Sequence, residues 1–120
     1  MIDWKRVKEL REEIGDNDFA AVADMFLEEA DQTVAKLTLD LAAEEIEALL
    51  HFLKGSALNL GLSDLASICE NGERMAAAGR GAQVDLSKVV TTYLASKAFF
   101  ANGLEEGCAN WGVLRFTGAG

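Results

Sequence analysis

The segment HFLKGSALNLG, residues 51–61, contains the only histidine of the chain, with a lysine three residues later and a glycine directly after it. An imidazole has an ordinary pKa of about 6.5, so at pH 7 most of it is unprotonated and nucleophilic. The ring of His51 can therefore accept a phosphoryl group through a nitrogen. It can also release the group, because imidazolium is a good leaving group. Lys54, one helical turn along, is placed to offset the added negative charge.

The glycine at position 55 lies where a helix is expected, and glycine inside a helix costs about 1 kcal/mol relative to alanine. Gly55 therefore needs a reason in packing or in access. With no side chain beside the imidazole, the active site of another protein can close over His51. Phosphoryl transfer depends mainly on in-line positioning and charge neutralisation, most of which such a partner can supply.

The helical wheel of residues 41–60 directs His51 away from the core. The core-facing stripe consists of Ile46, Leu50, Leu53, Ala57 and Leu60. His51 lies about 145° from the centre of this stripe, at about 100° per residue. Gly55 lies almost opposite the stripe, and Lys54 lies on its flank. We therefore expect His51 to face solvent.

The outer surface of the same helix is unusually apolar for a solvated face. It carries Ala48, Phe52, Leu58 and Asn59 beside His51. Exposed apolar residues gathered around a reactive group are typical of an interaction surface, in which a few central apolar residues contribute most of the binding energy. We predict a docking surface with Ala48, Phe52 and Leu58 at its centre and Asn59 at its rim.

The elements that must hold this helix are themselves helical. Apolar spacings of three and four residues predict five helices, punctuated by glycine, and no strand pattern is present. The expected ranges are 3–14, ending at Gly15; about twenty residues from residue 18; 41–60, with Asp40 as a possible N-cap and Gly61 as the stop; 63–78, with Ser63 as a plausible N-cap; and a fifth from Asp85 to just before Gly107. Helices joined by short connections pack as antiparallel neighbours, which predicts a bundle.

Composition excludes several classes of partner. The chain has 11 basic and 20 acidic residues in 120, a net charge of -9. Nucleic acids and anionic membrane surfaces require a basic footprint, so neither is expected as a partner. No signal peptide and no apolar run of membrane length is found. The two cysteines, Cys69 and Cys108, are too few for a disulfide framework or a metal site and indicate reduced thiols in a cytoplasm, with Cys69 in the core.

The segment HFLKGSALNLG resembles the signature of histidine-containing phosphotransfer (Hpt) domains, His-x-x-Lys-Gly-Ser/Ala-x-x-x-apolar-Gly. The matching residues are His51, Lys54, Gly55, Ser56, Ala57, Leu60 and Gly61. Upstream, FLEEADQTVAKL resembles the second helix of the family, and LASICENGERMAAAG resembles the helix after the signature. The resemblance implies an all-α antiparallel four-helix bundle with an additional N-terminal helix, over residues 1–107, and a tail, 108–120, that is docked or frayed. Gly72 departs from the family pattern, in which leucine is commoner, and this puts the packing of the fourth helix in question.

The resemblance also implies roles for the residues of the signature. His51 is expected to be the phosphoacceptor, Lys54 its phosphate neighbour and Gly55 the clearance for a docking receiver domain. The chain would accept a phosphoryl group from a receiver-domain aspartate and pass it to another receiver domain. Its partners would be response-regulator receiver domains and a hybrid sensor histidine kinase. The partner would supply the magnesium ion, so we expect no cofactor or metal here.

The chain is expected to be a phosphocarrier and not an enzyme in its own right. It has no glycine-rich phosphate loop, which argues against an autokinase. A full core on five helices favours a monomer.

Two other functions remain open from the sequence. One is a degenerate bundle that docks a receiver domain without carrying phosphate. The other is a helical enzyme that uses His51 as a general base, which would require a pocket and a carboxylate to orient the ring. Glu47, one turn before His51, could make that hydrogen bond, although a solvated glutamate is the simpler interpretation. A convex outer helix face is a poor place for such a pocket.

Overall fold

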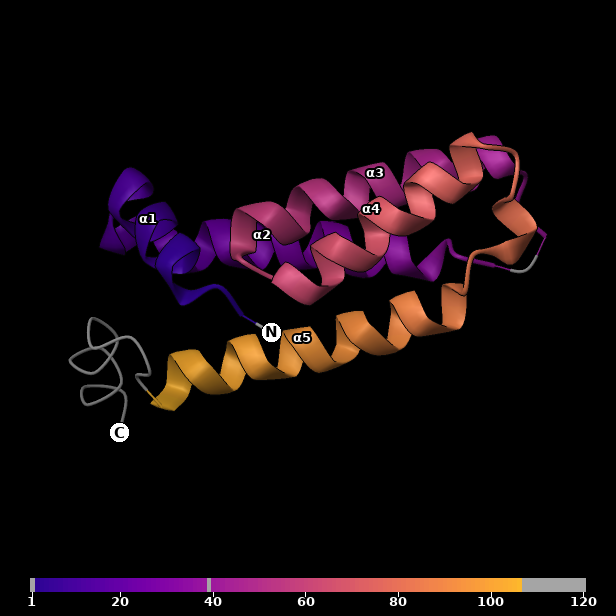
Figure 1. Cartoon of the computed structure of the whole chain (residues 1–120). Helices are drawn as coiled ribbons and strands as arrows, with labels where there is room; N and C mark the ends of the chain where they lie inside the picture. The colour runs from indigo at the N-terminus through magenta and orange to yellow at the C-terminus, as the bar shows by residue number, and fades with distance from the viewer. Residues whose placement is uncertain (1, 39, 107–120) are drawn as a thin grey trace.

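The computed structural model describes residues 2–38 and 40–106, with the side chains described as far as Gly103. The described residues form helices and their connections, and none of them forms a β-strand (Figure 1). The elements are α1 (Trp4–Ile14), α2 (Asp16–Ala35), α3 (Ala43–Leu60), α4 (Ser63–Ala77), the short 3-10 helix η1 (Gly81–Gln83) and α5 (Leu86–Glu106). The all-α prediction is confirmed, and the tail 108–120 lies outside the described residues.

Helices α2 to α5 form the bundle, and α3 packs against both α2 and α4. The core-facing stripe predicted for α3 is confirmed, because all five of its residues are buried. Leu65, Cys69, Val89 and Phe100 complete the centre of the core from α4 and α5. The interior is thus a single apolar cluster to which each of the five α-helices contributes.

A group of polar contacts around Tyr93 fixes α5 against α2. The hydroxyl of Tyr93, a buried residue of α5, lies 3.2 Å from the backbone oxygen of Leu27 and contacts the carboxylate of Asp31. The ammonium of Lys97 lies 3.0 Å from the same carboxylate. A buried hydroxyl normally requires a hydrogen-bond partner. The contacts with Leu27 and Asp31 provide one for Tyr93 and also set the register of the two helices.

Helix α1 crosses one end of the bundle, at the side where α3 ends and α4 begins (Figure 1). The ring of Trp4 stacks on that of Phe100 in α5, with 6.1 Å between the centroids. Ile2 forms an isolated β-bridge with Leu62, and the backbone N–H of Asp3 donates to the carbonyl of Gly61 over 2.7 Å. The N-terminal helix is therefore joined to the turn between α3 and α4.

Two of the predicted helix caps are wrong. Helix α3 begins at Ala43, two residues after the expected start, and its N-cap is Ala42, whose backbone N–H donates to the side chain of Glu45 over 3.1 Å. Because the carboxylate of Glu45 reaches back to this donor, Asp40 is not the cap. Helix α4 has Leu62 as its N-cap, so Ser63 is its first helical residue. Leu62 takes that position because its buried side chain and its bridge to Ile2 fix it there.

Gly72, the departure from the family pattern, packs closely in α4. A Cβ atom at this position would lie 2.6 Å from Cδ1 of Leu50 and 3.2 Å from Cγ1 of Val84. Helix α4 runs unbroken from Ser63 to Ala77 through this glycine. The question about its packing is thus answered, since Leu50 and Val84 occupy the space that a larger side chain would need.

We predict that Gly72→Leu lowers the free energy of unfolding by about 1–3 kcal/mol, because it overpacks the contact with the fully buried Leu50. Urea unfolding of the variant measures the loss. The matched test combines Gly72→Leu with Leu50→Ala. The double variant should be more stable than the sum of the two single losses predicts, because the new leucine enters the space that Leu50 vacates. Strict additivity would contradict this account.

Candidate functional site

His51 lies in the middle of α3 with its side chain 69% exposed, so the predicted outward direction is confirmed. The Nδ1 atom of its ring lies 2.6 Å from Oε1 of Glu73 in α4. Helices α3 and α4 are antiparallel, and His51 and Glu73 are equally far along the chain from Leu62. The short turn therefore brings these two residues side by side.

The carboxylate of Glu73 also binds Lys54. The Nζ atom of Lys54 lies 2.8 Å from Oε2 of Glu73, so one carboxylate connects the imidazole to the ammonium. The hydrogen bonds from Lys54 and then His51 lower the pKa of Glu73 and outweigh the effect of its partial burial. The hydrogen bond to Glu73 likewise raises the pKa of Lys54. Both groups are therefore charged at neutral pH.

The contact with Glu73 assigns different roles to the two ring nitrogens of His51. An ionised carboxylate only accepts hydrogen bonds, so Nδ1 of the ring must carry the proton that it donates. In the neutral ring the other nitrogen, Nε2, then holds the free lone pair. The cluster of His51, Glu73 and Lys54 thus presents a ring with a fixed tautomer and one nucleophilic nitrogen.

Gly55 borders open space. An added Cβ atom would meet nothing within 4 Å, and the backbone at this position is ordinary α-helix. Neither packing against the described residues nor backbone conformation requires a glycine here. The surface beside His51 is consequently flat at the place where most residues would project a side chain.

The predicted docking residues lie on the exposed surface of α3. Phe52 is 49% exposed and Leu58 is 56% exposed, so neither is tucked beneath a neighbouring helix, and Ala48 is exposed as well. Asn59 is half-buried and already engaged. Its Nδ2 donates to the carbonyl of Gly55 over 3.0 Å, and its Oδ1 accepts from Arg6 of α1 over 3.4 Å.

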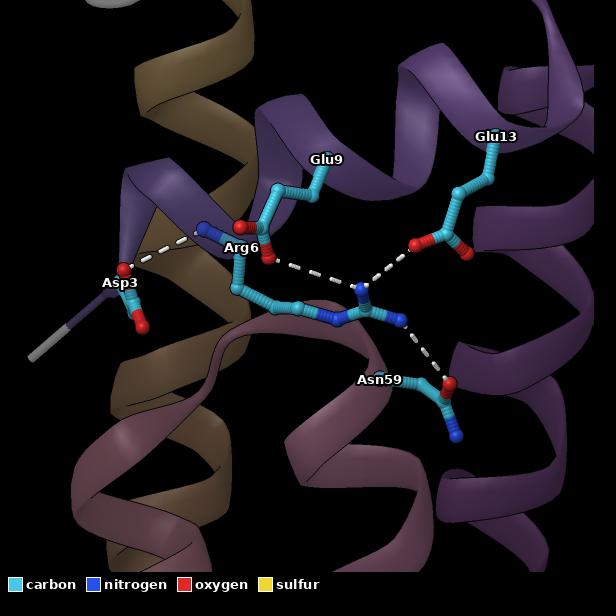
Figure 2. A network of polar contacts seen from close by, with 5 residues as sticks. All are labelled: Asp3, Arg6, Glu9, Glu13 and Asn59. Carbon is cyan, nitrogen blue, oxygen red and sulfur yellow. Dashed lines mark hydrogen bonds and ion pairs between the residues drawn. The ribbon is translucent and has the colours of Figure 1, made fainter.

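Figure 2 shows how Arg6 reaches from α1 towards the end of α3. The Nη1 atom of its guanidinium lies 3.1 Å from the carboxylate of Glu13 and 3.8 Å from that of Glu9. The Nη2 atom donates to Asn59. Two carboxylates thus hold the cation against α3. The rim of the predicted docking surface therefore includes contacts from α1.

Glu73 is the residue of this cluster that the sequence did not single out. The segment LASICENGERMAAAG contains it, but nothing in the pattern of α4 alone marks it. Glu47, which was considered as a partner of the ring, is not the residue that contacts it. Pairing α3 with α4 around Gly61 is what identifies Glu73.

The hollows, the cysteine and the helix lengths of the described residues add no second reactive site to the His51 cluster. Hollows of about 360 and 440 Å³ lie along η1 and α5, and His51 lines neither of them. Cys69 is fully buried, and burial raises the pKa of its thiol to about 12, which confirms that it is a core residue. Within residues 2–38 and 40–106 there is no helix long and apolar enough to cross a membrane. Cys108 is outside the described residues.

Comparison with known proteins identifies the family. A family model described as the Hpt domain matches residues 21–105, which include the His51 cluster and span from α2 into α5. Comparison with curated proteins and with solved structures finds no match. Hpt domains are phosphocarrier modules that interact with receiver domains and kinases of two-component systems. The chain belongs to the Hpt domain family, and its general role is histidine phosphotransfer in a phosphorelay.

Proposed function

We propose that His51 is the phosphoacceptor, and that it takes the phosphoryl group from a receiver-domain aspartate and passes it to another receiver domain. The observation that carries this proposal is the hydrogen bond between Nδ1 of His51 and Glu73, on a ring that is mostly exposed. It leaves Nε2 as the nucleophile on the side of the ring away from Glu73. A partner protein can approach that side because Gly55 adds no bulk.

The transfer step needs no movement of a proton. The lone pair of Nε2 attacks the phosphorus atom of the aspartyl phosphate, and the bond from phosphorus to the aspartate oxygen breaks. The aspartate leaves as a carboxylate, while Nδ1 of His51 keeps its proton. The phosphorylated ring is cationic, and the negative charge of Glu73 beside Nδ1 stabilises it. The second transfer reverses these bonds on another aspartate.

Lys54 and the partner share the remaining charge neutralisation. The ammonium of Lys54 is held near the ring by Glu73, where it can offset the charge of the phosphoryl group. The magnesium ion is expected to come with the receiver domain, which also brings the reacting aspartate. Phe52, Leu58 and Ala48 would form the apolar centre of the docking surface, and their exposure supports this role.

The phosphoacceptor is tested by His51→Gln. We expect the variant to accept no phosphoryl group from a phosphorylated receiver domain, assayed as acid-labile, base-stable phosphate on the protein. Its melting curve should be almost unchanged, because substitutions of exposed residues usually cost less than about 0.5 kcal/mol. Phosphate retained by His51→Gln would refute the proposal. A folded wild-type protein that binds the receiver domain but takes no phosphate would favour the degenerate binding module.

The contribution of Glu73 is tested by Glu73→Gln. Glutamine can still accept a hydrogen bond from Nδ1, but it cannot stabilise a cationic ring by charge. Because charged hydrogen bonds exceed neutral ones by about 1 kcal/mol, phosphoryl acceptance should slow by about five- to tenfold. The matched control is Glu47→Gln, on the same face as His51 and without a contact to its ring, and it should transfer at the wild-type rate.

Two further measurements separate positioning of the ring from a general loss of structure. Ring nitrogen chemical shifts should report a proton on Nδ1 in the wild type and a mixture of tautomers in Glu73→Ala. The pKa of Glu73 is lowered in the folded protein, so its charge stabilises the fold above the ordinary value of 4.5. That contribution disappears as the pH falls through the lowered pKa. The stability difference between wild type and Glu73→Gln should shrink there, and unchanged tautomers in Glu73→Ala would count against the assignment.

Clearance beside His51 is tested by Gly55→Leu. The free energy of unfolding should stay constant or rise by up to about 1 kcal/mol, because leucine is the better helix former and an added Cβ meets nothing there. Transfer from the receiver domain should nevertheless slow strongly. Gly55→Ala is the control, since it makes the same backbone change with far less bulk and should slow transfer less. Equal transfer rates in all three proteins would remove the steric role of Gly55.

A further inference from the structure

The contacts between α1 and the last turn of α3 lie beside the predicted docking surface, and Arg6 is at their centre (Figure 2). The Nη2 atom of Arg6 donates to Oδ1 of Asn59 over 3.4 Å. The Nδ2 atom of Asn59 donates to the carbonyl oxygen of Gly55 over 3.0 Å. A chain of two hydrogen bonds thus runs from α1 to the backbone of α3, one turn after His51.

Contacts at the start of α1 place Arg6 next to Asn59. The backbone N–H of Asp3 donates to the carbonyl of Gly61 over 2.7 Å, which joins the start of α1 to the end of α3. The carboxylate of Asp3 accepts from the backbone N–H of Arg6 over 3.2 Å. The guanidinium of Arg6 is then held by Glu13 at 3.1 Å, and its side chain is only 25% exposed. Arg6 therefore lies against α3 and does not extend into solvent.

Arg6 determines which way the amide group of Asn59 is turned. A guanidinium only donates hydrogen bonds, so the atom of Asn59 that faces it must be the oxygen. The nitrogen of the amide is then directed to the other side, where it bonds to the carbonyl of Gly55. Without the guanidinium, the amide can turn towards solvent and release this carbonyl.

Asn59 in turn restrains the surface beside His51. Glycine has more backbone freedom than any other residue, so the turn of α3 at Gly55 is less constrained than its neighbours. A side-chain hydrogen bond to the carbonyl of Gly55 restrains this turn. The same bond folds Asn59 back along the helix. Residues four apart are neighbours on a helix, so a released Asn59 side chain can enter the open space beside Gly55.

We propose that Arg6 is a positioning residue for phosphotransfer, which acts through Asn59 to keep the surface beside His51 flat for a docking receiver domain. The ring of His51 is held from α4 by Glu73, whereas Asn59 is held from α1 by Arg6. Loss of Arg6 therefore leaves the tautomer and the nucleophile of the ring unchanged and weakens the docking of the partner. This inference rests on the proposed role of His51 as the phosphoacceptor.

Transfer from a phosphorylated receiver domain, measured at increasing receiver concentration, separates docking from chemistry. Arg6→Met keeps the apolar stem of the side chain and removes the guanidinium. The half-saturating concentration should rise about fivefold, the effect of one ordinary hydrogen bond, while the maximal rate changes less than about twofold. Arg6→Lys restores a positive charge and a donor, so it should recover part of the loss. A lower maximal rate at an unchanged half-saturating concentration would overturn the proposal.

The matched control for Arg6→Met is Lys8→Met, which removes the same charge from an exposed position of α1. Because no contact with α3 is lost, both transfer parameters should stay within about twofold of the wild type. Equal effects of Arg6→Met and Lys8→Met would make the charge of α1 the cause and would overturn the positioning role.

A double-variant cycle tests whether Arg6 acts through Asn59. Asn59→Ala should weaken docking as Arg6→Met does, and adding Arg6→Met to Asn59→Ala should cause no further loss. Strictly additive losses would show that Arg6 acts on the partner by itself, which would contradict the proposal.

Hydrogen exchange of the Asn59 side-chain amide tests the same contact without any partner. Its N–H protons should be protected in the wild type and in Lys8→Met, and this protection should be lost in Arg6→Met. Equal exchange in the wild type and Arg6→Met would overturn the inference whatever the transfer assay shows. A wild-type protein that takes no phosphate while Asn59 is protected would instead refute the role of His51, so the two failures are distinguishable.

Discussion

The tight turn between α3 and α4 is the constraint on which the site depends. Gly61 adopts a left-handed conformation with φ of 74°, which ends α3 and reverses the chain within two residues. A Cβ atom there would lie 2.6 Å from the carbonyl oxygen of Asp3, so the same position also admits the start of the N-terminal segment. A shift of one residue in this turn would rotate Glu73 away from His51. The geometry of the cluster is therefore set at a distance from it along the chain.

Three glycines of this bundle show that one residue type can serve three physical purposes. Gly61 provides a backbone conformation, Gly72 provides room for Leu50 inside the core, and Gly55 leaves a surface open. Gly55 and Gly72 both lie within helices and look alike in the sequence. Only the neighbouring helices distinguish them, because α4 meets core side chains at Gly72 and α3 meets nothing at Gly55.

The sequence predicted those parts of the structure that depend on one helix at a time. The apolar period placed the core stripe of α3 and turned His51 outward, and Gly61 marked the end of that helix. Features that depend on two segments were missed or wrong. The contact of Glu73 with His51 depends on how α4 is aligned with α3. Asp40 does not cap α3, because the side chain of Glu45 accepts from the backbone of Ala42. Leu62 is the N-cap of α4, where its bridge to Ile2 holds it. The hydrogen bond that Asn59 accepts likewise depends on a second segment, because its donor is Arg6 of α1.

The contact between Arg6 and Asn59 connects the site to a part of the chain outside the matched region. Helix α1 precedes residue 21, where the family match begins, yet its arginine binds the side chain that bonds to the carbonyl of Gly55. The surroundings of His51 are thus built from the segment that the family model matches and from α1, which precedes that segment. A change in α1 can therefore alter how Asn59 is held beside Gly55 while every residue of the segment 51–61 stays the same.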